Sequence, residues 1–106
     1  MNALNSILIE GNVIANPGKR ETPRGTTVCD FKIASSRFYR QDETTEEERS
    51  IFDIESWAKL AESCAEHCTE GRGVRVVGRL KQCEDGRIKI VAEHVEYKPV
   101  FNKKSS

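Results

Sequence analysis

The sequence predicts an all-β domain in which a five-stranded sheet closes into a barrel and one short helix covers an end. Three observations lead to this fold class. Five stretches have the alternation or the apolar character of strands. Only one stretch, between the third and fourth strands, changes to the three-and-four spacing of an amphipathic helix. One helix cannot cover both faces of an open sheet, whereas closing the sheet on itself buries one face.

The first two strands are separated by a segment rich in turn residues. The first strand is expected over 6–14, with a bulge or bend at Gly11. Residues 15–27 hold all but one of the chain's prolines together with two glycines, and favour turns. The second strand is expected over 28–40, where Cys29, Phe31 and Ile33 alternate with polar residues.

Charge is balanced overall but distributed unevenly. The chain has 17 basic and 17 acidic residues. Residues 42–49 hold five of the acids and one of the bases, which leaves 16 bases against 12 acids elsewhere. Such an acidic block is typical of a flexible, solvated loop. Overall neutrality therefore does not exclude a polyanionic partner.

The third strand, expected over 51–57, carries the only tryptophan of the chain. Alternation places Phe52 and Ile54 on the core face and Trp57 on the outer face. The alternative is a buried core tryptophan, because large aromatics are usually well buried. An outward tryptophan on a barrel is instead a platform on which nucleobases stack. The outer face also carries two acids, Asp53 and Glu55.

The rest of the chain supplies the helix and the last two strands. The helix lies within 58–73, and its apolar stripe consists of Leu60, Ala61, Cys64, Ala65 and Cys68. The fourth strand is expected over 74–83 and the fifth over 87–99, joined by a tight turn at 84–86. We expect one domain over residues 1–100 and a short tail over 101–106.

The sequence gives little support to metal binding, redox chemistry or catalysis. Cys64, His67 and Cys68 share one helix side and are zinc-ligand types, but no second motif completes a four-ligand site. The two cysteines also lack the spacing of a thioredoxin-type pair. No phosphate loop and no pairing of a nucleophile with a base is readable. We expect no cofactor, no metal and no enzyme, with a small metal or redox protein as an alternative.

The chain has no apolar run of roughly 18 residues and no signal-peptide pattern at its start, so we expect a cytoplasmic protein with reduced thiols.

Five strands with a helix between the third and fourth is the layout of the oligonucleotide-binding barrel. In such barrels nucleic acid lies on the outer face around the second and third strands.

Five motifs resemble the bacterial single-stranded DNA-binding protein family: "NSILIEGNVIANP", "FKIASSRFYR", "WAKLAE", "GRLK" and "IVAEHVEYKP". They occur in the family's order and span nearly all of residues 5–99. The resemblance implies binding of single strands with little sequence preference, in DNA replication, recombination and repair. It also implies a homotetramer and a nucleoid-associated location.

The resemblance also indicates which residues contact the strand. It assigns stacking to Tyr39 and Trp57, and a further contact to Ile51 with Phe52 beside it. It places bases at Lys59 and Lys81. The residues themselves add further bases that we expect to meet phosphates, because basic and aromatic side chains interleave in single-strand grooves: Lys32, Arg37, Arg40, Arg75 and Arg79. Phe38 is expected to face the core or an interface.

The chain departs from the family pattern in two places. The hairpin between the fourth and fifth strands is shortened to "CEDGR", which removes a third stacking contact. The end, "KKSS", is not the acidic, hydrophobic tip through which family members recruit repair enzymes. We therefore do not expect such recruitment. The alternative is a specialised barrel of the primosomal type that acts mainly as a protein adaptor.

Overall fold

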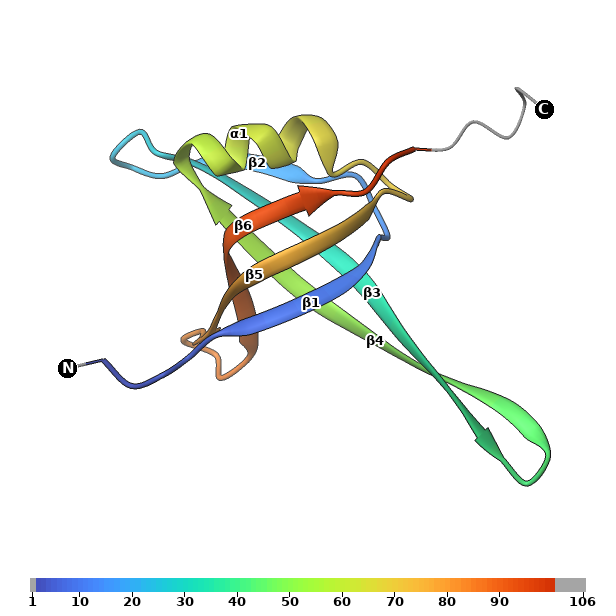
Figure 1. Ribbon diagram of the computed structural model, residues 1–106. Helices are drawn as coiled ribbons and strands as arrows, with labels where there is room; N and C mark the ends of the chain where they lie inside the picture. Colours follow the sequence, from blue (N-terminus) through green and yellow to red (C-terminus); the bar gives the residue numbers. More distant parts are fainter. Residues whose placement is uncertain (1, 101–106) are drawn as a thin grey trace.

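The computed structural model describes residues 2–100 and forms a barrel of strands with one helix at an end (Figure 1). The expected tail, 101–106, lies outside the described residues. The elements, in chain order, are β1 (Ile7–Val13), β2 (Gly18–Glu21), β3 (Thr27–Gln41), β4 (Thr44–Trp57), α1 (Ala58–His67), β5 (Gly73–Gln82) and β6 (Ile88–Tyr97). No described helix is long and apolar enough to cross a membrane.

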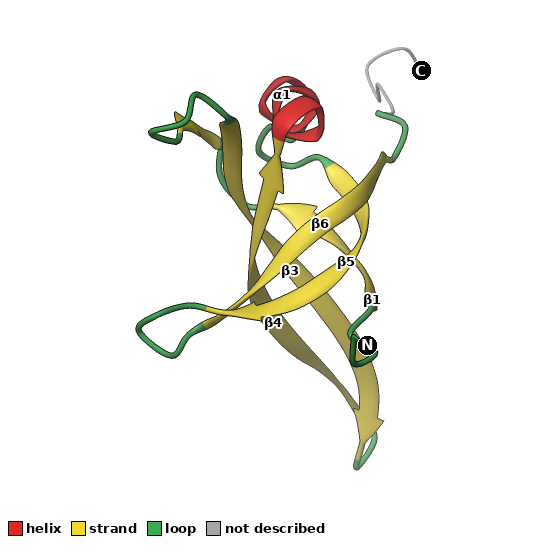
Figure 2. Cartoon of the chain, turned by 90° about the vertical axis from the view of Figure 1, so that its left-hand side faces the viewer, coloured by secondary structure: helices red, strands yellow, loops and turns green. Residues whose placement is uncertain are grey.

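The predicted five-stranded barrel is confirmed. Strands β1, β5, β6, β4 and β3 follow one another in the sheet, and a β1–β3 pairing closes the ring. All neighbouring strands are antiparallel except β4 and β6, which pair in parallel only through Ile54–Ile90 and Glu55–Val91. Helix α1 lies across one end of the barrel (Figure 2). The architecture is that of an oligonucleotide-binding barrel.

Strand β2 is an addition to the prediction. Its four residues, GKRE, are all exposed and pair with the start of β3. The sequence did not reveal it because a strand with no apolar side chain has no alternation to read. Of the bulge or bend expected at Gly11, the bulge is wrong, since the β1–β5 register runs through Gly11 without a shift. Gly11 instead allows close approach, because an added Cβ would lie 2.5 Å from the carbonyl oxygen of Ala34.

The core is made by the inward faces of the strands and by one face of α1. Phe31, Ile33 and Ile54 are at most 4% exposed. The predicted helix stripe is confirmed, because Ala61, Cys64 and Cys68 are fully buried against them while Leu60 and Ala65 pack at the edge. Each large apolar side chain removed from water in this way contributes about 1.5–3 kcal/mol.

The expected acidic loop over 42–49 is not a loop. Strands β3 and β4 continue as a two-stranded ribbon that extends away from the barrel (Figure 1), and Asp42 and Glu43 alone form the turn. Both turn residues have positive φ, 48° and 69°, as the favoured two-residue hairpin turns require. Two of its acids have partners on the opposite strand: the Ser36 hydroxyl donates a 2.8 Å hydrogen bond to Glu47, and Arg37 pairs with Glu48.

Candidate nucleic-acid interface

Trp57 ends β4 and faces outward, as predicted. It pairs with Val28 of β3, and its side chain projects from the face opposite Ile54. The residue is 40% exposed. The backbone turns sharply after it into α1, because Ala58 has a φ of 57°, in the left-handed region that a residue with a Cβ adopts at a cost. The strand end therefore fixes where the indole ring projects.

Glu55 lies on the outer side of β4, as the alternation predicted. It is nevertheless buried there, with only 2% of it exposed. The Trp57 Nε1–H donates to its Oε1 at 2.9 Å, and Arg20 Nη2 and Lys89 Nζ donate to its Oε2 at 3.1 and 2.5 Å. These side chains come from β2, β4 and β6 and cover the carboxylate.

The environment of Glu55 keeps it ionised. Burial raises the pKa of this carboxyl group, but the hydrogen bonds from Lys89 and Trp57 and the positive charge of Lys89 outweigh that effect. The pKa of Glu55 therefore lies below its ordinary value. A buried carboxylate is tolerated in a folded protein when it is paired and hydrogen-bonded in this way.

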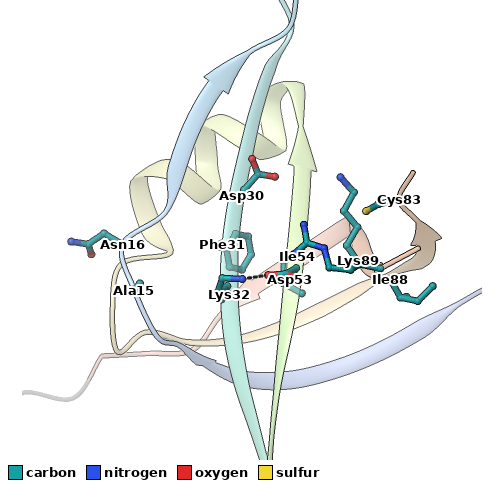
Figure 3. A pocket seen from close by; sticks show the side chains of 11 residues that line it. Ala15, Asn16, Asp30, Phe31, Lys32, Asp53, Ile54, Cys83, Ile88 and Lys89 are labelled. Atoms are coloured by element: carbon teal, nitrogen blue, oxygen red, sulfur yellow. Dashed lines mark hydrogen bonds and ion pairs between the residues drawn. The ribbon is translucent and has the colours of Figure 1, made fainter. Parts of the chain in front are cut away.

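Asp53, the second acid beside Trp57, is partly exposed and pairs with Lys32 across the β3–β4 ladder (Figure 3). Both side chains line a cavity of about 320 Å³ between these strands and the β5–β6 hairpin. Phe31 and Ile54 contribute its apolar wall. The cavity is therefore a recess that combines charged side chains with apolar surface.

The aromatic pair on the β3–β4 ribbon is arranged differently from the expectation. The β3–β4 register is unbroken from Val28–Trp57 to Gln41–Thr44, so side chains alternate strictly between the two ribbon faces. Phe38 consequently lies on the ribbon face that carries Trp57, and Tyr39 lies on the other. Phe38 is 66% exposed, which rules out the core position but leaves the expected interface position as a prediction. Tyr39 is 37% exposed. The Arg37 guanidinium lies 5.3 Å from the centre of the Tyr39 ring.

The next candidate positions toward the barrel separate in the same way. Ile51 is 44% exposed and lies on the ribbon face of Trp57. Phe52 projects to the opposite face, where it is partly buried and packs against the core. The structure therefore brings Ile51, and not Phe52, next to the outer surface.

The candidate bases fall into two groups by their ionic contacts. Four already have carboxylate partners: Lys32 with Asp53, Arg37 with Glu48, Arg75 with Glu10 and Glu96, and Arg79 with Glu93. Within residues 2–100 the other three have no ion pair: Arg40, Lys59 and Lys81. More than half of the candidate bases are thus neutralised by carboxylates.

The cysteines lie away from this face, except for Cys83. Cys29, Cys64 and Cys68 are buried, and burial raises the pKa of the Cys29 thiol to about 11. His67, the third residue of zinc-ligand type on the helix, contacts the ring of Tyr97, with 4.9 Å between ring centres. Across the described part of the chain, no three metal-ligating side chains come together. Cys83 is partly exposed and lines the cavity.

Fold and surface together define a barrel of the oligonucleotide-binding class whose outer face presents aromatic, apolar and basic side chains. The model of the Single-strand binding protein family matches residues 4–97, so the chain belongs to this family. Two curated relatives are both named single-stranded DNA-binding protein. The one from Corynebacterium glutamicum is 40% identical to this chain over 80 residues, and the one from Aquifex aeolicus is 33% identical over 100 residues.

These alignments take in 73% and 87% of this chain, but 36% and 68% of the two relatives. Among solved structures, a deletion mutant of the single-stranded DNA binding protein from Thermus aquaticus superposes with a TM-score of 0.79. That superposition covers 91% of this chain and 51% of the other, at 24% identity, and supports the same fold.

Proposed function

We propose that this protein binds single-stranded DNA without sequence preference and acts by coating the strand, not by catalysis. The observation that carries the proposal is the half-exposed Trp57 ring on the outer face of the barrel of a single-strand binding family member. Base stacking on an aromatic ring contributes roughly 1–3 kcal/mol per base and is tolerant of sequence, because every base has a π-face.

The strand would run over β3 and β4 from Trp57 toward the ribbon. Ile51 and Phe38 continue the Trp57 face of the ribbon, and Tyr39 offers a ring on its other side. Of the seven candidate bases, Arg40, Lys59 and Lys81 are the most available for phosphates, because they have no ion pair with a carboxylate among the described residues. Replication, recombination and repair are the processes that expose such strands, on the nucleoid in the cytoplasm.

We extend the proposal to a homo-oligomer, a tetramer by family resemblance. One barrel offers few stacking positions, and several barrels together would lengthen the bound stretch. An exposed apolar position on β1, Leu8 at 66% exposure, pairs with Val77 of β5 on the outer side of the sheet and suits a contact between copies. Light scattering coupled to size exclusion tests this, and a monomer at micromolar concentration would contradict it.

The test of binding is a titration of the protein with poly(dT), monitored by intrinsic fluorescence at low and high salt. Because the chain has one tryptophan, the signal reports on Trp57 alone. We expect strong quenching that weakens as salt is added. Binding seen with a labelled oligonucleotide but without quenching would move the contact elsewhere. An absence of binding at low salt would overturn the proposal and favour a protein adaptor.

A further inference from the structure

Glu55 is the one acidic side chain among residues 2–100 that is buried, and its two oxygens have separate partners. Oε1 accepts the Trp57 Nε1–H, while Oε2 accepts from Arg20 and Lys89. One carboxylate thus connects the exposed aromatic ring to two cations of the same face. Arg20 is held a second time, by Asp30 at 2.6 Å.

The position of Glu55 in the sheet strengthens the connection. It belongs to one of the two residue pairs through which β4 and β6 close this part of the barrel, Glu55–Val91. Lys89 lies two residues before Val91 on β6. Its ion pair with Glu55 therefore joins the same two strands as this short ladder. Replacing Glu55 by an apolar residue would therefore affect the strand pairing, the cations and the ring together.

The hydrogen bond to Glu55 restricts the motion of the Trp57 ring. An indole whose Nε1–H is bonded to a buried acceptor, itself bonded to Arg20 and Lys89, has less freedom to rotate. A ring that is already ordered loses less side-chain freedom when a base stacks on it, which favours binding.

We propose that Glu55 is a positioning residue of this surface, which orients Trp57 through the indole N–H and holds Arg20 and Lys89 beside it as one unit. The inference rests on the proposed single-strand binding, which gives the oriented ring its purpose. The hydrogen bond and its effect on ring motion are properties of the free protein. They can therefore be tested whether or not the chain binds DNA.

The first experiment uses the unaltered protein. With one tryptophan, a ¹⁵N-labelled sample gives one indole N–H resonance. We expect its exchange with solvent to be at least about tenfold slower than in free tryptophan, because the proton is hydrogen-bonded inside the fold. Exchange at the rate of a free indole would overturn the proposal without recourse to any variant.

The second experiment compares Glu55→Gln with Glu55→Leu, with Asp30→Asn as the control. Glutamine keeps an oxygen acceptor for the indole, so we expect slow ring motion in fluorescence anisotropy decay and full poly(dT) quenching. Leucine removes the acceptor, and we expect faster ring motion and about threefold to tenfold weaker binding. Asp30→Asn removes the negative charge of the other carboxylate partner of Arg20 and should leave ring motion unchanged.

The outcomes separate the two proposals. If Glu55→Leu folds, as judged by circular dichroism, and its ring motion equals that of the parent protein, Glu55 does not position Trp57. If the glutamine variant behaves like the leucine variant, the acceptor is not the cause, and the inference also fails. If ring motion changes as expected but no form binds poly(dT), the positioning role stands and the proposed function fails.

Discussion

Because most of the candidate bases are already paired with carboxylates, we predict that the affinity for single-stranded DNA depends less steeply on salt than the number of candidate bases alone would suggest. On a single strand, the slope of log affinity against log salt is about −0.7 for each phosphate neutralised. If all seven candidate bases contacted phosphates without competition, the slope would be about −5 per barrel. Only three of the seven lack a carboxylate partner among the described residues, which corresponds to about −2.

The substitution Asp53→Asn isolates one of these pairs. Lys32 and Asp53 are both roughly half exposed, so breaking their ion pair should change the free energy of unfolding by less than about 1 kcal/mol. Freed from its partner, Lys32 becomes available for a phosphate, and the slope should steepen by about 0.7. Between 50 and 200 mM salt this makes the loss of affinity about threefold larger than in the parent protein.

The assay is a set of poly(dT) titrations between 50 and 400 mM sodium chloride. Glu66→Gln is the matched control, because it removes one negative charge from the exposed side of α1 and frees only His67. It should leave the slope unchanged. Two results would refute the reasoning: a parent slope near −5, or equal slopes for Asp53→Asn and the parent.

Three further predictions concern stability and reactivity. Ala58→Gly should raise the free energy of unfolding by about 1 kcal/mol in urea melts, because glycine adopts the φ of 57° without strain; unchanged or lower stability would mean that the turn carries no strain. In the native protein, Ellman's reagent should label one thiol, Cys83, quickly, and rapid labelling of further thiols would contradict the burial of the other three cysteines. The ionised Glu55 carboxylate, whose pKa is lowered on folding, stabilises the fold above its unfolded pKa, and that contribution is lost as the pH falls through the folded pKa. The stability difference between the parent and Glu55→Gln should therefore shrink from pH 7 to pH 3, where Arg20 and Lys89 remain charged; a constant difference would argue against the lowered pKa.

The strands whose side chains alternate between core and solvent were predictable from the sequence. Phe31, Ile33 and Ile54 mark inward faces, and the same alternation correctly placed Trp57 outside. The helix stripe was readable for a similar reason, because burial on one side leaves a periodic apolar pattern.

Features that depend on partners distant in sequence were not predictable. The burial of Glu55 is produced by Arg20 and Lys89, which lie 35 and 34 residues away. The hydrogen bond between Glu55 and Trp57, two residues apart, was not predictable either, because no pattern of apolar residues indicates it. Only the first part of the ribbon, 36–40, was predicted as strand. The part over 41–49 was missed because the ribbon strands are exposed on both faces and are selected by cross-strand polar pairs, which composition alone does not reveal.

The unbroken register of the β3–β4 ribbon constrains how this part of the molecule can vary between relatives. One residue inserted into a single strand would either form a bulge or exchange the two ribbon faces from that point to the tip. Phe38 and Tyr39 would then trade sides. Lengthening or shortening by whole cross-strand pairs at the Asp42–Glu43 turn would preserve every face. Natural variation in ribbon length should therefore occur in steps of two residues, one from each strand.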